Sequence, residues 1–538
     1  MLRYSHLEFY GMNRFITLLF LMMSALSWSQ RQNFEDFYPN GKKRSEGRYE
    51  RGLEDSTWKY YYENGALQEV SNYKMGKFHG PVLRYHPNGA LMVEGYFKND
   101  KQDSIQKTFS ADSILLELGY FKLGKKSGTW ATFNGKGDTL TMEEYTDSLQ
   151  RMMYFRSVSG SVTCRDGNGS VTEYFENGKP RMITHYSGGL PDSVFVEYFS
   201  GGSIKVEGKY TLGKKQGLWK EYYVTGKPRK LIHYLNGTPD GLIEEYYVNG
   251  QLNVSGNHLQ GKKNGKFSWF RSDGQPDMSG SFENDIQTGE WIYWYDNGQK
   301  HYWGEYLEGK MHGSWKYRYR TGESWKEGTY AHGLKEGKWQ YWFENGKLLM
   351  EGNFKNDLEE GQWVSYYDSG KPKDKGSYSK GKMNGAWEGY YPNGVKNYVG
   401  SWKNDEKTGS WSYWTDRGRM EKMETYNDRG ELHGPTEIYG ANGKLESKGS
   451  YKNKKPHGKW TYFHPHGPVL RECEYDQGKL NGKSKIYGVS GKLIEECSYK
   501  NNKRDGLYTS YDEKTGKIII KQEFVNGKIV KVIEGKPK

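Results

Sequence analysis

The chain has 538 residues, among them 70 glycines, 46 tyrosines, 18 tryptophans and only three cysteines. Three cysteines exclude a disulfide-stapled scaffold. The 79 basic and 66 acidic residues leave a formal charge of +13, with both signs interspersed along the chain. No nucleic-acid recognition motif accompanies this modest surplus, so we expect no nucleic-acid binding and a solvated surface that keeps a long sheet soluble.

Residues 1–29 predict a cleaved signal peptide. Arg14 supplies a charged region, residues 15–23 form an apolar stretch, and small residues precede a cleavage point before Gln30. The apolar stretch is too short to span a bilayer, although an uncleaved anchor remains the alternative. Met12 is an alternative start, because a polar prefix precedes it. We therefore expect an exported protein that is periplasmic, outer-membrane-associated or secreted.

A 24-residue period fills the rest of the chain and predicts a repeat architecture. It is clearest in the evenly spaced residues Trp291, Trp315, Trp339, Trp363, Trp387 and Trp411. The 24-residue period is kept over N-terminal repeats at 30–137 and over a C-terminal array with a terminal cap at 169–538. Between them, residues 138–168 form an irregular insertion. Because repeats of this kind contact only their neighbours, one array can have any length.

Each period is interpreted as one β-hairpin. Asn345 and Gly346 predict a two-residue type I′ turn, which needs positive φ at both positions. The aromatic flanks suit a half-buried pleated surface. With this turn, Trp339 faces Gly352 across the hairpin, and we expect that glycine to make room for the indole. A second turn then leads into the next Gly-x-Trp.

The motif carries a family resemblance. The run E-G-R-Y-E-R-G-L-E-D-S-T-W-K-Y-Y-Y-E-N-G-A-L at 46–67 resembles the MORN repeat, in its bacterial Asn-Gly variant, and similar runs cover nearly all of the mature chain. The resemblance implies an elongated, twisted, single-layered antiparallel sheet with roles in protein or lipid contact. Some bacterial relatives are labelled antitoxins. We therefore expect an all-β fold of tandem 24-residue hairpins, roughly twenty in number.

The sequence predicts no enzyme, cofactor or metal site. Histidines recur before the loop glycine at His79, His312, His433 and His457, but equivalent residues of successive hairpins lie roughly 9–10 Å apart. That is too far for ligands of one metal ion, each of which must lie about 2.1 Å from it. No catalytic triad, phosphate loop or carboxylate pair stands apart from the repeat.

Two rows are candidate interaction surfaces. One repeat position in the second turn holds Lys77, Lys101, Lys125, Lys214, Lys262, Lys310, Lys382, Lys455, Lys479 and Lys503. Lysine there also protects sheet edges, which is the alternative explanation. An aromatic position on the opposite face holds Trp294, Trp342, Tyr366, Tyr390 and Trp414. Aromatic rings stack on glycans or partner strands, unless the sheet curls and buries them.

The leading functional hypothesis is a non-catalytic protein-interaction or structural scaffold in the cell envelope. The first alternative is a carbohydrate- or cell-wall-binding surface protein, and a lipid surface is also a possible partner. An antitoxin-like partner protein is the second alternative, and it requires a cytosolic location. The sequence does not identify the partner or the oligomeric state.

Overall fold

The computed structural model describes residues 31–535, so the predicted signal peptide lies outside the described residues. The described strands form one antiparallel sheet of 46 strands, and residues 31–535 contain no helix. The all-β repeat fold predicted from the 24-residue period is confirmed. The first strand begins at Arg31, directly after the predicted mature start.

Nothing in the described part of the chain is a helix with the length and apolar character needed to cross a membrane.

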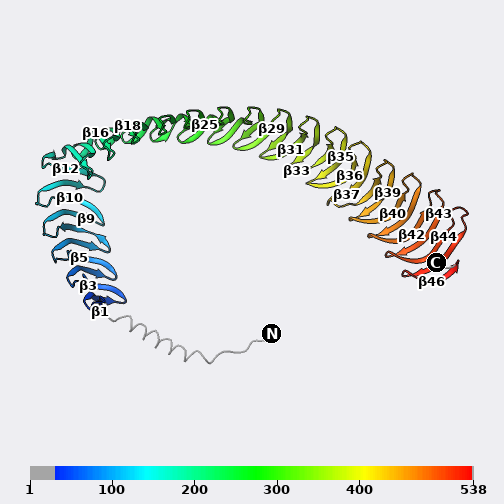
Figure 1. The fold of residues 1–538 in the computed structure, drawn as a ribbon, viewed down its shortest axis with the longest axis horizontal. Helices are drawn as coiled ribbons and strands as arrows, with labels where there is room; N and C mark the ends of the chain where they lie inside the picture. The colour runs from blue at the N-terminus through cyan, green and yellow to red at the C-terminus, as the bar shows by residue number, and fades with distance from the viewer. Residues whose placement is uncertain (1–30, 536–538) are drawn as a thin grey trace, which may run out of the picture. The chain divides into compact units, whose positions relative to one another are not determined.

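The described residues divide into two compact units, one that runs to residue 252 and includes 258–262, and one that includes 253–257 and runs from 263 onward. In each unit the strands pair with their neighbours in chain order, so the unit extends along the pairing direction (Figure 1). This is the meander of hairpins that the repeat predicts.

The strands up to residue 252 are β1 (Arg31–Phe37), β2 (Lys43–Glu50), β3 (Leu53–Tyr61), β4 (Leu67–Lys74), β5 (Lys77–Tyr85), β6 (Leu91–Lys98), β7 (Lys101–Gln102), β8 (Ser104–Phe109), β9 (Leu115–Lys122), β10 (Lys125–Phe133), β11 (Thr139–Tyr145), β12 (Gln150–Arg156), β13 (Val162–Arg165), β14 (Asn168–Tyr174), β15 (Pro180–Ser187), β16 (Leu190–Tyr198), β17 (Ile204–Thr211), β18 (Lys214–Tyr222), β19 (Pro228–Leu235) and β20 (Thr238–Tyr246). Strands β21 (Leu252–Leu259) and β22 (Lys262–Lys263) follow.

The remaining strands are β23 (Gly265–Phe270), β24 (Pro276–Glu283), β25 (Ile286–Trp294), β26 (Lys300–Leu307), β27 (Lys310–Arg318), β28 (Ser324–Ala331), β29 (Leu334–Trp342), β30 (Leu348–Lys355), β31 (Leu358–Tyr366), β32 (Pro372–Ser379), β33 (Lys382–Met383), β34 (Gly385–Tyr390), β35 (Lys396–Lys403), β36 (Glu406–Trp414), β37 (Met420–Tyr426), β38 (Gly434–Tyr439), β39 (Leu445–Lys452), β40 (Lys455–Phe463), β41 (Val469–Asp476), β42 (Lys479–Tyr487), β43 (Leu493–Lys500), β44 (Lys503–Tyr511), β45 (Ile518–Val525) and β46 (Lys528–Glu534).

Residues 138–168, which the sequence sets apart as an insertion, also form strands of the sheet. Strands β12 and β13 pair through Phe155 and Cys164. The turn before β13 closes through a hydrogen bond from the Gly160 N–H to the Ser157 carbonyl, 2.9 Å long, as in the Asn-Gly turns. The interval is therefore built from shortened hairpins.

The predicted cross-strand register is confirmed at its centre. Trp339 lies opposite Gly352, and Tyr341 lies opposite Met350. The same thirteen-residue offset pairs Trp291 with Gly304, Trp315 with Gly328, Trp363 with Gly376 and Trp387 with Gly400.

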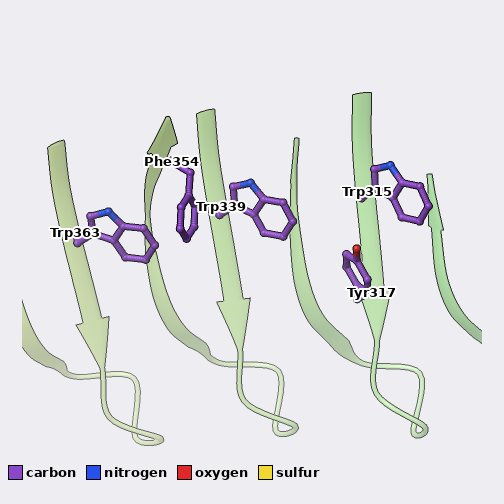
Figure 2. Packing of buried hydrophobic residues seen from close by; sticks show 5 residues of the cluster. All are labelled: Trp315, Tyr317, Trp339, Phe354 and Trp363. Atoms are coloured by element: carbon purple, nitrogen blue, oxygen red, sulfur yellow. The ribbon is translucent and has the colours of Figure 1, made fainter. Parts of the chain in front are cut away.

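The expectation that Gly352 makes room for the Trp339 indole is wrong. A Cβ added at Gly328, on the preceding strand, would lie 2.5 Å from Cγ of Trp339, whereas one at Gly352 would meet Trp363. Figure 2 shows the indoles of Trp315, Trp339 and Trp363 leaning in the same direction across the sheet. Each indole therefore covers the glycine eleven residues before it.

A β-bulge explains this direction. Between β28 and β29 the pairing passes from Glu327 with Gln340 to Thr329 with Glu336, which leaves Gly328 opposite a three-residue stretch. Gly337 in that stretch has φ of 67°, a left-handed conformation that glycine adopts without strain. The indole Nε1 then donates to the carbonyl of Thr329 at 3.1 Å.

The same bond, to the carbonyl ten residues earlier, recurs throughout both units. Its donors are Trp58, Trp130, Trp219, Trp291, Trp315, Trp339, Trp363, Trp387, Trp411 and Trp460. All ten have glycine at the eleventh residue before them. At several positions where a smaller residue replaces the tryptophan, a larger one replaces the glycine, as in the opposed pairs Ser71 and Val82, Ile232 and Ile243, and Cys473 and Ser484.

The Asn-Gly turn is not the predicted type I′ turn. At this turn only Gly346 has positive φ, 80°. The N–H of Gly346 donates to the carbonyl of Phe343 at 2.9 Å, and the N–H of Phe343 donates to the carbonyl of Lys347 at 2.8 Å. This is a three-residue loop ending in one left-handed residue, so Trp342 rather than Phe343 faces Leu348.

The type I′ geometry belongs to the second turn. Lys355 lies opposite Leu358, and the two residues between them, Asn356 and Asp357, have φ of 51° and 66°. This geometry matches the twist of the flanking strands, which makes these turns the tight ends of the hairpins.

The two C-terminal cysteines should remain unlinked. Ser484 on β42 lies between Cys473 and Cys497 and opposite both, as the meander predicts. All three cysteines are free and buried, and burial raises the pKa of each thiol. Because the thiolate is the reactive form, we expect slow alkylation of the native protein and complete alkylation after unfolding, measured by mass spectrometry. A Cys473–Cys497 disulfide in the monomer would contradict the strand order.

Candidate functional site

The ten lysines of the predicted ladder each directly follow the second turn or its equivalent, and all ten are exposed. The ion pairs of the described residues use other lysines, such as Lys126, Lys338 and Lys454. The ladder is continuous over Lys77, Lys101 and Lys125 and again over Lys455, Lys479 and Lys503, where Lys528 extends it. Elsewhere it is interrupted by residues such as Thr238, Ile286 and Leu334.

A second row of lysines, which the sequence reasoning missed, packs on the tryptophan face. The Nζ of Lys335 lies 4.9 Å from the ring centroid of Trp339, and that of Lys407 lies 4.4 Å from Trp411. Burial lowers the pKa of Lys407. The signal was a K-x-G-x-W run, which places the lysine four residues before the indole. These lysines stabilise the core through cation–π contacts and are not available to a partner.

The predicted aromatic row lies on the other face, at strand ends. Trp294, Trp342, Tyr366, Tyr390 and Trp414 are the last residues of β25, β29, β31, β34 and β36, and all five are half-buried. Three of their carbonyls accept a hydrogen bond from a tyrosine hydroxyl of the loop one repeat earlier: Tyr319 donates to Trp342 at 2.7 Å, Tyr367 to Tyr390 at 2.7 Å, and Tyr391 to Trp414 at 2.9 Å. The backbone beneath these three rings is therefore fixed.

The Asn-Gly loops form a ladder of side-chain bonds that the sequence reasoning also missed. Asn345 Nδ2 donates to the carbonyl of Asp368 at 3.1 Å, and Lys347 Nζ donates to that of Ser369 at 3.0 Å. Equivalent amide bonds come from Asn40, Asn64, Asn88, Asn177, Asn297, Asn393 and Asn442. The asparagine thus links one repeat to the next.

Charged groups flank the aromatic row. Glu351 accepts from Lys338 Nζ at 2.8 Å and from Gln340 Nε2 at 2.9 Å. The hydrogen bond from Lys338 is the main cause that holds the pKa of Glu351 below its usual value. The face is therefore polar and ordered around half-exposed rings.

The lowered pKa of Glu351 predicts that the stability of this repeat depends on pH. The contribution of the Lys338–Glu351 pair to the free energy of unfolding is fully present above the pKa of the unfolded carboxyl, about 4.3. It is lost as the pH falls through the lower pKa of the folded state. Lys338 is largely exposed, so we expect at most about 1 kcal/mol. The melting temperatures of Glu351→Gln and of the wild type should differ at pH 6, and the difference should shrink as the pH falls below about 4.3. A difference that grows in acid would contradict the assignment.

Histidines provide no metal site in the described chain. No group of three or more His, Cys, Asp or Glu side chains within residues 31–535 is placed to hold an ion. His79 instead lies 3.3 Å from the Asn99 side chain, and His433 lies 3.2 Å from Asn453, in both cases Nδ1 to Oδ1. The side chains of these two histidines therefore contact residues of neighbouring tight turns.

Comparison with known proteins gives one family. The MORN repeat variant family matches nine segments, at 54–75, 78–99, 168–187, 215–236, 335–356, 359–380, 383–404, 432–453 and 480–501. Comparison with curated proteins finds no match.

Similar solved structures include the crystal structure of TcdB2-TccC3-Cdc42, with 10% identity and a TM-score of 0.13 over 92% of this chain. The Photorhabdus luminescens Tc holotoxin pore has 9% identity and a TM-score of 0.12 over 91% of this chain. The chain spans 30% and 29% of those chains, and TM-scores this low carry no argument. The nine repeat segments, from residue 54 to residue 501, show that the chain belongs to the MORN-repeat family.

Proposed function

We propose that the chain is an exported, non-catalytic scaffold that binds a protein partner in the cell envelope. The repeat family and the repeated sheet already indicate a repeat-based interaction scaffold. The observation that carries the proposal is the aromatic row, whose five half-buried rings occupy one repeat position at strand ends, interrupted once by Arg318. The predicted signal peptide supports export.

The row suits a protein partner because rings on a fixed backbone present large contact area at low entropic cost. Glu351 and Glu388 lie beside it with their lysine partners, so the rim is polar as in known interfaces. A cell-wall glycan is the second candidate, because tryptophan rings such as those of Trp294 and Trp414 offer flat faces of the kind on which sugars stack.

The test uses the mature chain, residues 30–538, as bait against envelope extracts. The row variant carries Trp342→Ala, Tyr366→Ala and Tyr390→Ala. The control carries Val224→Ala and Val248→Ala, at two exposed loop positions. A protein captured by the wild type and the control but lost with the row variant supports the proposal. Equal capture by all three overturns the role of the row.

Two further measurements separate the alternatives. Fractionation of cells that express the full chain should place the protein outside the cytosol, with Gln30 as the first residue of the mature form. Retention in the cytosol would contradict export and favour the antitoxin-like alternative. Binding to one wall polymer on a glycan array, with no protein captured, would favour the carbohydrate-binding alternative.

A further inference from the structure

Three consecutive tight turns of the first unit place lysine directly opposite lysine. The opposed pairs are Lys74 with Lys77, Lys98 with Lys101, and Lys122 with Lys125. We refer to these six residues as the basic edge. Like charges directly opposite each other on a sheet are destabilising, so the arrangement works against folding unless something neutralises it.

Ion pairs within the described chain do not neutralise the basic edge. All six side chains are exposed, and none forms an ion pair with a described acidic residue. Three carboxylates reach these turns: Asp100 accepts the N–H of Phe78 at 2.8 Å, Asp103 accepts that of Leu123 at 3.3 Å, and Asp55 accepts that of Met75. The edge therefore carries six ammonium groups against three carboxylates, each of which is bound to a backbone N–H, and it keeps an excess of positive charge.

The edge is also rigid. The N–H of Asp100 donates to the carbonyl of Phe78 at 3.0 Å, and that of Gly124 donates to the carbonyl of Gln102 at 2.7 Å. These bonds fix each turn against the preceding one. Successive turns lie two strands apart, roughly 9–10 Å, which is about one Debye length at moderate salt, so their potentials add.

We propose that the basic edge binds a linear polyanion, an anionic polysaccharide whose sulfate, phosphate or carboxylate groups follow the turns. A double row of ammonium groups along a line matches a chain with repeated charges, because each further contact is intramolecular once the first has formed. A flat anionic bilayer is less suited, because the lysine pairs follow one narrow line of turns.

The inference rests on the proposed scaffold function but uses different residues, since the aromatic row lies elsewhere. The second unit repeats the arrangement at Lys452 with Lys455 and at Lys500 with Lys503. The sequence reasoning found one member of each pair in the ladder. The second lysine of each pair was missed, because the sequence did not show that a two-residue turn places the two lysines opposite each other.

The experiment measures binding of fluorescent dextran sulfate to the mature chain. The edge variant carries Lys74→Gln, Lys98→Gln and Lys122→Gln. The matched control carries Lys214→Gln, Lys310→Gln and Lys382→Gln, which remove the same charge from exposed turn lysines that face Thr211, Leu307 and Ser379. We expect the edge variant to lose about tenfold or more in affinity and the control less than about twofold.

A second readout does not depend on the polymer. Without polyanion, the edge variant should unfold at a higher temperature than the wild type, because it removes like-charge repulsion, whereas the control should not. Equal losses of affinity in the two variants, or no dextran sulfate binding by the wild type, would overturn the proposal. Binding only to vesicles of phosphatidylglycerol and phosphatidylcholine would overturn it in favour of a membrane. Partner capture by the edge variant would remain intact, which separates this result from failure of the proposed function.

Discussion

Replacing Trp339 with alanine is expected to destabilise strands β28 to β30 by about 3–5 kcal/mol, the range found for truncated buried tryptophan. Its side chain is fully buried, with 0% exposure, and its ring lies 5.0 Å from that of Tyr330 in an edge-to-face arrangement. The change also leaves the Thr329 carbonyl without its indole donor. Hydrogen exchange of the amides in these strands measures the loss locally, which suits an array whose repeats open separately.

The matched control is Trp342→Ala, three residues along the same strand. Trp342 is half-buried on the other face and belongs to the candidate interaction row. We expect this variant to change local stability by less than about 1.5 kcal/mol, because little cavity forms. Comparable losses in the two variants would mean that the tryptophan face is not the core.

Replacing Gly328 with alanine is expected to cost about 1–3 kcal/mol, although alanine ordinarily suits a strand better than glycine. The added Cβ would fall inside the Trp339 ring envelope, 2.5 Å from Cγ, so the indole must leave its position. Reduced protection of β28 and β29 and a shift of tryptophan emission would report the displacement.

Gly95→Ala is the control for this change. Gly95 occupies the same repeat position, but Gln106 replaces the tryptophan, and the nearest neighbour of an added Cβ is Gln102 Nε2 at 3.7 Å. That is ordinary contact, so Gly95→Ala should be neutral or stabilising. Destabilisation of both variants to the same degree would show that the indole is not what the glycine accommodates.

Which residues lie opposite each other can be predicted from the sequence more readily than the direction in which a side chain points. The period predicted the register that places Trp339 opposite Gly352. The register does not show that a bulge at Gly337 turns the indole toward Gly328. A signal was present, because the tryptophans that make this bond have glycine eleven residues earlier, while the residue thirteen later is sometimes Ser71 or Glu424.

The type of the Asn-Gly turn was predicted wrongly for a related reason. Asn-Gly is typical of type I′ turns, but here Asn345 is kept for its amide, which reaches Asp368 in the next loop. The true type I′ turns hold varied residues, such as Asn356 with Asp357 and His332 with Gly333, whose common feature is positive φ. A bond between repeats leaves no pattern within a single hairpin, so sequence reasoning about one unit could not find it.

The positions of the two surface rows were predicted correctly, but the contacts of the neighbouring lysines were not. The exposed ladder and the aromatic positions follow from the period alone. The cation–π lysines and the opposed lysines of the basic edge required the pairing across the tight turn, which places Lys74 opposite Lys77. The occurrence of lysine at one repeat position reveals neither the cation–π contacts nor the opposed pairs.

A double-mutant cycle between positions 328 and 339 tests the central claim, that each indole is seated on the glycine eleven residues earlier. Trp339→Val with Gly328→Ser reproduces the native pair of Val82 and Ser71. We predict that Gly328→Ser costs about 1–3 kcal/mol beside Trp339 and close to nothing beside valine, measured by hydrogen exchange of β28 and β29. Gly352→Ser should cost the same in both backgrounds, since it disturbs Trp363. Coupling of residue 339 to position 352 and not to position 328 would contradict the account.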